Sequence, residues 1–170
     1  MALQPFERVA LGRTSVQVTR LGLGTASLAG LFRAVSDEEA AVVLDRAWEV
    51  GFRYYDTAPL YGYGLGEQRV GRLLQQHDLS GWALSTKVGR LLYPSAEIEA
   101  NPGLEPDRPA VDIPGFDPDE GYFKGTWDLR PVFDYSYEGV MRSVEASLAR
   151  TGLDRVDILW IHDPDQHWQE

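Results

Sequence analysis

Three short β-prone segments of this chain each end in a polar residue, and segments with helical periodicity lie between them. The polar residues are Asp56, Lys87 and His162. When the irregular segment 91–135 is set aside, their spacing approaches the roughly 30 residues of one β/α unit. Repetition of such units places parallel strands side by side with helices on the outside. The pattern therefore predicts an α/β fold built on a parallel sheet.

Hydrophobic periodicity gives approximate boundaries for the expected elements. Inner strands are expected near residues 21, 53, 83 and 157. Helices are expected over residues 37–50, 66–76 and 136–152. Ser36 and Glu39 match a capping box before the first helix, and Gly51 supplies its stop. Strand and helix signals thus alternate along the chain.

The N-terminal segment 8–20 reads as a β-hairpin, because apolar residues alternate on both sides of the turn-forming run 12–15. A complete (β/α)8 TIM barrel needs roughly 200 to 250 residues, whereas this chain has 170. We therefore expect a single domain, residues 1–170, that holds about four β/α units. It would be half of a barrel, with the hairpin covering the end opposite the polar residues.

Segment 91–135 is rich in Pro, Gly, Asp and aromatic residues and shows no sustained period, so we predict a long inserted loop. Its aromatic side chains could line a pocket for a polyhydroxylated ring or anchor the loop to the barrel. We expect anchoring for most of them and ligand contact for one or two. They are Tyr93, Phe116, Tyr122, Phe123, Trp127, Phe133 and Tyr135.

The acidic composition argues against several kinds of partner. The chain has 26 Asp and Glu against 16 Lys and Arg, a net charge of −10, and no basic stripe, so neither nucleic acid nor an anionic membrane surface is expected as a partner. No apolar run approaches the roughly 18 residues of a membrane helix, and residues 1–10 lack a signal-peptide core, so a cytoplasmic location is expected. The chain has no cysteine and no His–carboxylate spacing typical of metal ligands, so no metal site is expected.

Side chains at the carboxyl ends of neighbouring parallel strands converge on one edge of the sheet. Asp56, Lys87 and His162 should meet there, and Tyr61 lies in a glycine-rich loop that could fold back over it. A phenol has an ordinary pKa of about 10 and becomes a better acid beside a cation. Lys87 could be that cation, Asp56 could stabilise Lys87, and His162 could hydrogen-bond a substrate oxygen. Such a set could protonate a carbonyl while a hydride attacks its carbon.

Three sequence runs resemble the aldo-keto reductase superfamily. They are YDTAPLYG at residues 55–62, LSTKVG at 84–89 and ILWIH at 158–162, which match its Asp, Tyr, Lys and His blocks in order and spacing. Residues 21–25 and 66–71 extend the match. The insertion and the run HDPD at 162–165 most resemble the branch of sugar and pyridoxal dehydrogenases, which includes L-fucose, D-threo-aldose and D-galactose dehydrogenases.

The resemblance implies an NAD(P)-dependent oxidoreductase that acts on an aldose or a small aldehyde or alcohol. Tyr61 would be the general acid/base, Lys87 and Asp56 would tune it, and His162 would orient the carbonyl or hydroxyl. The nicotinamide of NADP or NAD would lie over Gly24, Thr25 and Ala26, beside Asp56. In the family, strands beyond this sequence hold most of the cofactor, so the chain corresponds to the N-terminal half.

Taken singly, these residues have ordinary explanations. Asp56 could begin a loop as an Asx residue, Lys87 could be a solvated charge, and His162 could simply end a strand. Two other functions also stay open. The chain could be a non-catalytic half-barrel that forms a homodimer or pairs with a missing C-terminal half. It could also be a lyase in which Lys87 forms a Schiff base.

Overall fold

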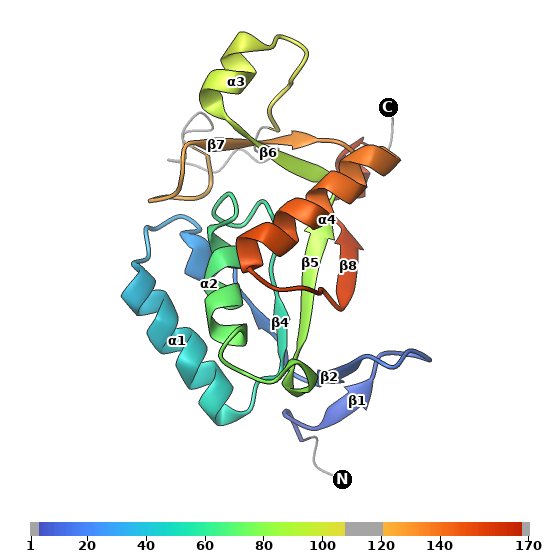
Figure 1. Ribbon diagram of the computed structural model, residues 1–170. Coiled ribbons are helices and arrows are strands. Elements are labelled where there is room, and N and C mark those ends of the chain that lie inside the picture. The colour runs from blue at the N-terminus through green and yellow to red at the C-terminus, as the bar shows by residue number, and fades with distance from the viewer. Residues whose placement is uncertain (1–3, 108–120, 168–170) are drawn as a thin grey trace.

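A parallel sheet of four strands forms the centre of the molecule (Figure 1). The computed structural model describes residues 4–107 and 121–167. The strands are, in spatial order, β3 (Leu23–Gly24), β4 (Tyr54–Asp56), β5 (Ala83–Val88) and β8 (Ile158–Ile161). All three pairings are parallel. The four predicted inner strands are thereby confirmed, in chain order across the sheet.

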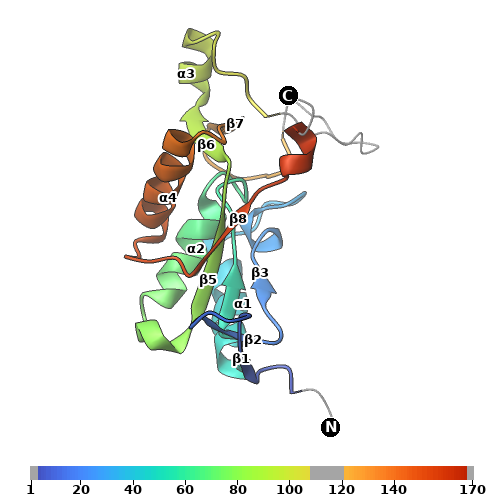
Figure 2. The ribbon, with the colours of Figure 1, turned by 90° about the vertical axis from the view of Figure 1, so that its right-hand side faces the viewer.

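Three helices follow the strands on the outside of the sheet, and Figure 2 shows α2 and α4 along the same side. They are α1 (Asp37–Val50), α2 (Leu65–Leu74) and α4 (Tyr137–Thr151). Ser36 and Glu39 form the expected capping box, and Gly51 ends α1 with φ at +113°. The predicted boundaries are confirmed for α1 and agree within two residues for α2 and α4. None of the described helices has both the length and the apolar character that a membrane span requires.

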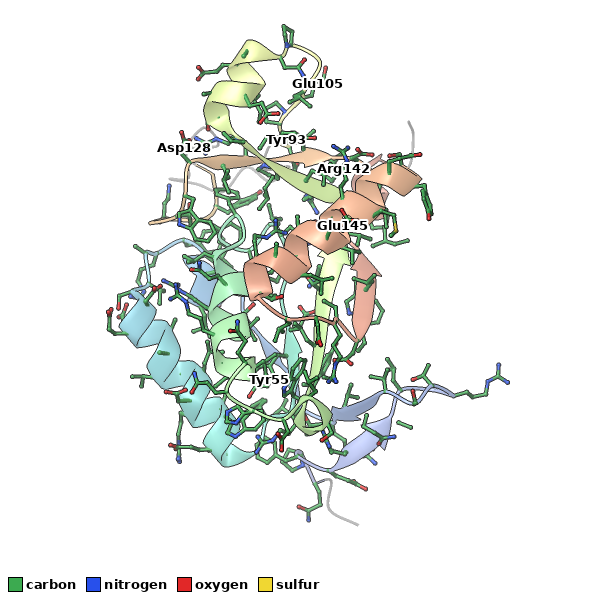
Figure 3. All side chains as sticks on the ribbon, in the orientation of Figure 1. Tyr55, Tyr93, Glu105, Asp128, Arg142 and Glu145 are labelled. Atoms are coloured by element: carbon green, nitrogen blue, oxygen red, sulfur yellow. The ribbon has the colours of Figure 1, made fainter. Side chains whose placement is uncertain are left out.

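The main apolar core lies between the sheet and its helices. Tyr55 and Leu84 are completely buried and sit opposite each other on β4 and β5. Because side chains alternate along a strand, their neighbours Tyr54 and Ser85 point to the other face, where their hydroxyl oxygens lie 3.1 Å apart. The helices cover the first face with Leu44, Val70, Leu73 and Leu74. In Figure 3, Tyr55 marks this core, well below Tyr93 and Asp128 at the opposite end.

The predicted N-terminal hairpin is confirmed as β1 (Arg8–Ala10) and β2 (Gln17–Thr19), an antiparallel pair. It lies at the amino ends of β4 and β5 (Figure 1). Thr19 accepts a hydrogen bond from the Arg53 amide at 3.2 Å, and Phe6 packs edge-on against Phe52 at 5.1 Å. These contacts place the hairpin at the end opposite Asp56 and Lys87, as expected.

Segment 91–135 differs from the predicted irregular loop. The described residues contain β6 (Arg90–Pro94), the short helix α3 (Ser95–Ala100) and β7 (Leu129–Phe133). β6 and β7 form an antiparallel pair in which Leu91 lies opposite Val132, and both are buried. The loop prediction was wrong here. β6 and β7 are far apart in the chain, so no short hairpin turn between them marks the pair in the sequence. Phe116, one of the expected aromatic contacts, lies outside the described residues.

The insertion, residues 91–135, is also tied to the loop after β3. Leu31 and Phe123 form an isolated antiparallel bridge. Phe32 donates its N–H to the Tyr122 carbonyl at 2.8 Å, and Lys124 donates its N–H to the Gly30 carbonyl at 2.9 Å. Backbone hydrogen bonds therefore fix residues 122–124 of the insertion to the loop after β3.

A close contact between α2 and α4 gives a test of this packing. A Cβ atom at Gly71 would overlap the carbonyl oxygen and Cα of Thr151. We expect Gly71→Ala to destabilise the fold by about 2 kcal/mol, because backbone atoms cannot rotate away and overpacking costs more than the helix-propensity gain of alanine. Urea unfolding would measure the loss. Gly81→Ala is the control, since its nearest neighbour, in the Trp48 ring, would lie 3.6 Å away; equal stability of the two variants would contradict the packing.

Candidate active site

The carboxyl ends of the parallel strands, here called the mouth, bring a lysine and a carboxylate together. Asp56 is the last residue of β4 and Lys87 the last but one of β5. Lys87 Nζ lies 2.7 Å from Asp56 Oδ2 and donates a second hydrogen bond to the Thr57 carbonyl at 2.9 Å. Ser85 donates its hydroxyl to Asp56 Oδ1 at 2.6 Å. The Lys87 side chain is only 13% exposed, so Lys87 is a compensated buried cation, not the solvated charge that its position alone would suggest.

Tyr61 reaches the mouth from the glycine-rich loop between β4 and α2. Its amide donates to the Ala58 carbonyl at 3.1 Å, and its carbonyl accepts from the Gly66 amide at 3.0 Å. The turn at Gly62 has φ at +63°, and a Cβ there would overlap the Ala29 carbonyl, so glycine is needed. The resulting loop places the centre of the Tyr61 ring 4.7 Å from Lys87 Nζ.

His162 directly follows β8 and completes the group. Its ring lies edge-on to the Tyr61 ring, with centroids 5.8 Å apart. Burial, and next the positive charge of Arg90, lower the pKa of His162 to about 4. The imidazole is therefore neutral near pH 7. Its Nδ1 is buried and has no hydrogen-bond partner among the described residues, which is costly unless a ligand supplies one.

The residues expected under a nicotinamide lie beside this group. Gly24 pairs in register with Asp56, and Thr25 donates both its amide and its hydroxyl to the Asp56 carbonyl at 3.0 Å. Ala26 follows at the start of a short 3-10 helix and is partly buried. A Cβ at Gly24 would meet no atom within 4 Å, so open space adjoins this backbone. These residues fit a flat ring lying against the backbone next to Asp56, and their cofactor role stays a prediction.

The structure thus brings Asp56, Tyr61, Lys87 and His162 to one mouth, as the strand-end pattern predicts. The catalytic roles assigned to them stay predictions. Sequence reasoning missed Ser85, which orients the carboxylate. Aligning the two predicted strands in parallel would have identified it, because the register places Ser85 opposite Asp56.

Among the aromatic residues of the insertion, two anchor it to the mouth and one is exposed. Phe123 is buried and contacts the rings of Tyr61 and Tyr63, at centroid distances of 6.2 and 5.8 Å. Tyr135 donates its hydroxyl to the His162 carbonyl at 2.5 Å. Trp127 is 40% exposed and lines an open pocket together with Tyr63. Contact between any of these rings and a ligand stays a prediction.

The chain is similar to two curated dehydrogenases. It is 42% identical over 163 residues to the pyridoxal 4-dehydrogenase of Microbacterium luteolum, and the alignment covers 96% of this chain and 45% of the relative. It is also 42% identical over 158 residues to a D-threo-aldose 1-dehydrogenase of a Pseudomonas species, covering 93% and 44%. The chain therefore spans somewhat less than half the length of these relatives.

A holo-form aldo-keto reductase from Bacillus halodurans has a similar structure. The TM-score is 0.60 at 26% identity, and the match covers 95% of this chain and 43% of that one. The fold is therefore that of a TIM barrel, of which the described strands form about half, and the predicted resemblance is confirmed. The model of the Aldo/keto reductase family matches residues 20–169. With strand order, mouth and sequence in agreement, this chain belongs to the aldo/keto reductase family.

Proposed function

We propose that this chain provides the proton-transfer groups of an NAD(P)-dependent oxidoreductase that interconverts an aldose, or a small aldehyde, with its oxidised or reduced partner. The observation that carries the proposal is the Lys87–Asp56 ion pair, at 2.7 Å, beside the ring of Tyr61. Membership of the family supports oxidoreductase chemistry. The names of the two dehydrogenase relatives support a sugar or an aromatic aldehyde as the substrate class.

The chemistry begins with the charge of Lys87. Asp56 and the Thr57 carbonyl accept hydrogen bonds from Lys87 Nζ and hold it inside the mouth. A fixed cation near the phenol stabilises the negative charge that develops on the Tyr61 oxygen as its proton leaves. In the reducing direction Tyr61 gives that proton to the carbonyl oxygen, and in the oxidising direction it takes a proton from the hydroxyl.

His162 has a different role in the same site. A neutral imidazole offers one N–H donor and one acceptor, so His162 can hold the reacting oxygen near Tyr61 without competing as an acid. NADP or NAD, when bound, supplies or accepts the hydride. Gly24, Thr25 and Ala26 would hold its nicotinamide against the sheet end beside Asp56.

The test of this function replaces the proposed acid. We expect Tyr61→Phe in the full-length protein to lower kcat by about 10²- to 10⁴-fold, the range for losing a general acid. The dissociation constant for NADPH or NAD should change less than about twofold, since only a hydroxyl is removed. Steady-state kinetics and nicotinamide fluorescence measure the two quantities.

Tyr63→Phe is the matched control, because Tyr63 lies two residues along the same loop and is buried against Phe123. It should keep kcat within about threefold of the original value, because Tyr63 has no part in the proposed proton transfer. Near-normal turnover in Tyr61→Phe, or an equal loss in both variants, would refute the assignment of Tyr61.

A second candidate function rests on the free edge of the sheet. β8 pairs with β5 on one side, and no described strand pairs with its other side. Its residues Leu159, Trp160 and Ile161 are 45%, 47% and 64% exposed. An apolar edge strand is a template for pairing with another chain. We propose that this edge pairs with a second copy of the chain or with a complementary half-barrel.

Sedimentation equilibrium of the 170-residue chain tests this association. We expect a dimer, and we expect Trp160→Lys to shift it to monomer because a charge would be buried at the new interface. Val42→Lys is the control, since Val42 is 69% exposed on α1 and should leave the dimer intact. A monomer with full secondary structure before any substitution would exclude self-association.

The Schiff-base alternative for Lys87 is less compatible with the geometry. A lysine must lose its proton to attack a carbonyl. Lys87 Nζ instead donates hydrogen bonds to the Asp56 carboxylate and the Thr57 carbonyl, which occupy it within the fold. The site therefore favours a structural and electrostatic role for Lys87.

A further inference from the structure

Arg90 is a buried charge near the mouth to which the proposed reaction assigns no role. It is the first residue of β6, three residues beyond Lys87, and only 2% exposed. Its Nε donates to Asp107 Oδ2 at 2.7 Å and its Nη2 donates to Asp163 Oδ2 at 2.9 Å. Its guanidinium also lies over the ring of Phe133, 4.4 Å from the centroid. A buried guanidinium with two carboxylate partners fixes the relative positions of the segments that carry them.

One of those carboxylates lies between Arg90 and the histidine. Asp163 Oδ2, the atom bound by Arg90, is also 3.6 Å from His162 Nε2. That distance is too long for a hydrogen bond to the imidazole. Asp163 is therefore engaged by the guanidinium, in a backbone conformation with φ at +45° that is unusual for a residue other than glycine. Without Arg90, the same oxygen could pair with the imidazole and favour its charged form.

Further hydrogen bonds hold the backbone of His162 and of Asp107, the second carboxylate partner of Arg90, in place. The amide of His162 donates to the Val88 carbonyl at 3.0 Å, and its carbonyl accepts from Tyr135 at 2.5 Å. Asp107 donates its amide to the Pro131 carbonyl at 2.7 Å. Since Asp107, β7 and Tyr135 all belong to the insertion, Arg90 joins the insertion directly to the segment that carries His162.

Charged and titratable groups approach the imidazole from every element packed around it. Burial is the main reason that the pKa of His162 is lowered, and Arg90 is the next. Lys87 acts in the same direction as Arg90, while Asp163 and Asp56 oppose it. The groups are Asp56 from β4, Tyr61 from the loop after β4, Lys87 from β5, Arg90 from β6, Tyr135 before α4 and Asp163 after β8.

We propose that Arg90 is the positioning residue for His162: by engaging Asp163 and Asp107 it holds the Asp163 carboxylate beyond hydrogen-bond distance of the imidazole Nε2. The inference rests on the proposed function, in which His162 hydrogen-bonds the reacting oxygen. Arg90 touches neither substrate nor cofactor in this role. It withholds a carboxylate from the histidine and fixes the segment that bears it.

An NMR titration of the histidine ring protons of this chain tests the arrangement without requiring activity. In the original chain His162 should titrate near pH 4. We expect Arg90→Met to raise that midpoint by about one pH unit or more, because Asp163 becomes free to pair with the imidazole and a nearby positive charge is lost. Arg90→Lys keeps the charge and should shift the midpoint less.

The double variant Arg90→Met/Asp163→Asn separates this effect from local unfolding. If Asp163 causes the shift, removing its charge should return the midpoint by about one unit toward the original value. Local unfolding would instead leave His162 near its ordinary value of about 6.5 in both variants. A midpoint unchanged by Arg90→Met, or equal in the single and double variants, would overturn the proposal.

Asp163→Asn alone covers the case in which Arg90→Met does not fold. Because Arg90 engages Asp163, this variant should lower the His162 midpoint by less than about one unit. A fall of one unit or more would show that Asp163 acts on the imidazole as strongly with Arg90 as without it, and would refute the proposal. None of these titrations depends on turnover, so failure of the Tyr61→Phe prediction and failure of this one are distinguishable.

Discussion

A lysine charge held almost out of water is the constraint on which the mouth depends. An ammonium buried without partners would be strongly unfavourable, so Lys87 needs Asp56 and the Thr57 carbonyl, at 2.7 and 2.9 Å. Both partners come from the end of the neighbouring strand, which makes the contact sensitive to strand register. A slip of one residue between β4 and β5 would turn Lys87 to the opposite face of the sheet. The ion pair and the packing of Tyr55 against Leu84 in the core therefore require the same register.

Much of this arrangement could be predicted because its signals are local. The capping box at Ser36 and the glycine at position 51 lie within one turn of the helix ends that they define. The strand ends at Asp56, Lys87 and His162 follow from short apolar runs and from the rule that parallel strands present their carboxyl ends on one side. The parallel topology by itself therefore predicts that these three side chains lie close together.

Long-range pairing accounts for what the sequence did not indicate. Arg90 resembles a surface residue in the run KVGR, and its burial depends on Asp107 and Asp163, which are 17 and 73 positions away. Glu67 is similar: it is completely buried within α2, and its partners Thr86 and Arg150 are 19 and 83 positions away. A charged residue alone predicts exposure. Only the assembled fold shows that each of these buried charges has a partner.

The insertion contacts the residues of the mouth directly. Phe123 packs on the ring of Tyr61, Tyr135 binds the His162 carbonyl, and Asp107 holds Arg90. Two of these contacts reach candidate site residues, and the third reaches the arginine proposed to position His162. Since Phe123 and Tyr135 belong to the same segment, a shift of that segment would change the surroundings of Tyr61 and His162 together. The β6–β7 pairing joins the two ends of the insertion by backbone hydrogen bonds and so resists such a shift.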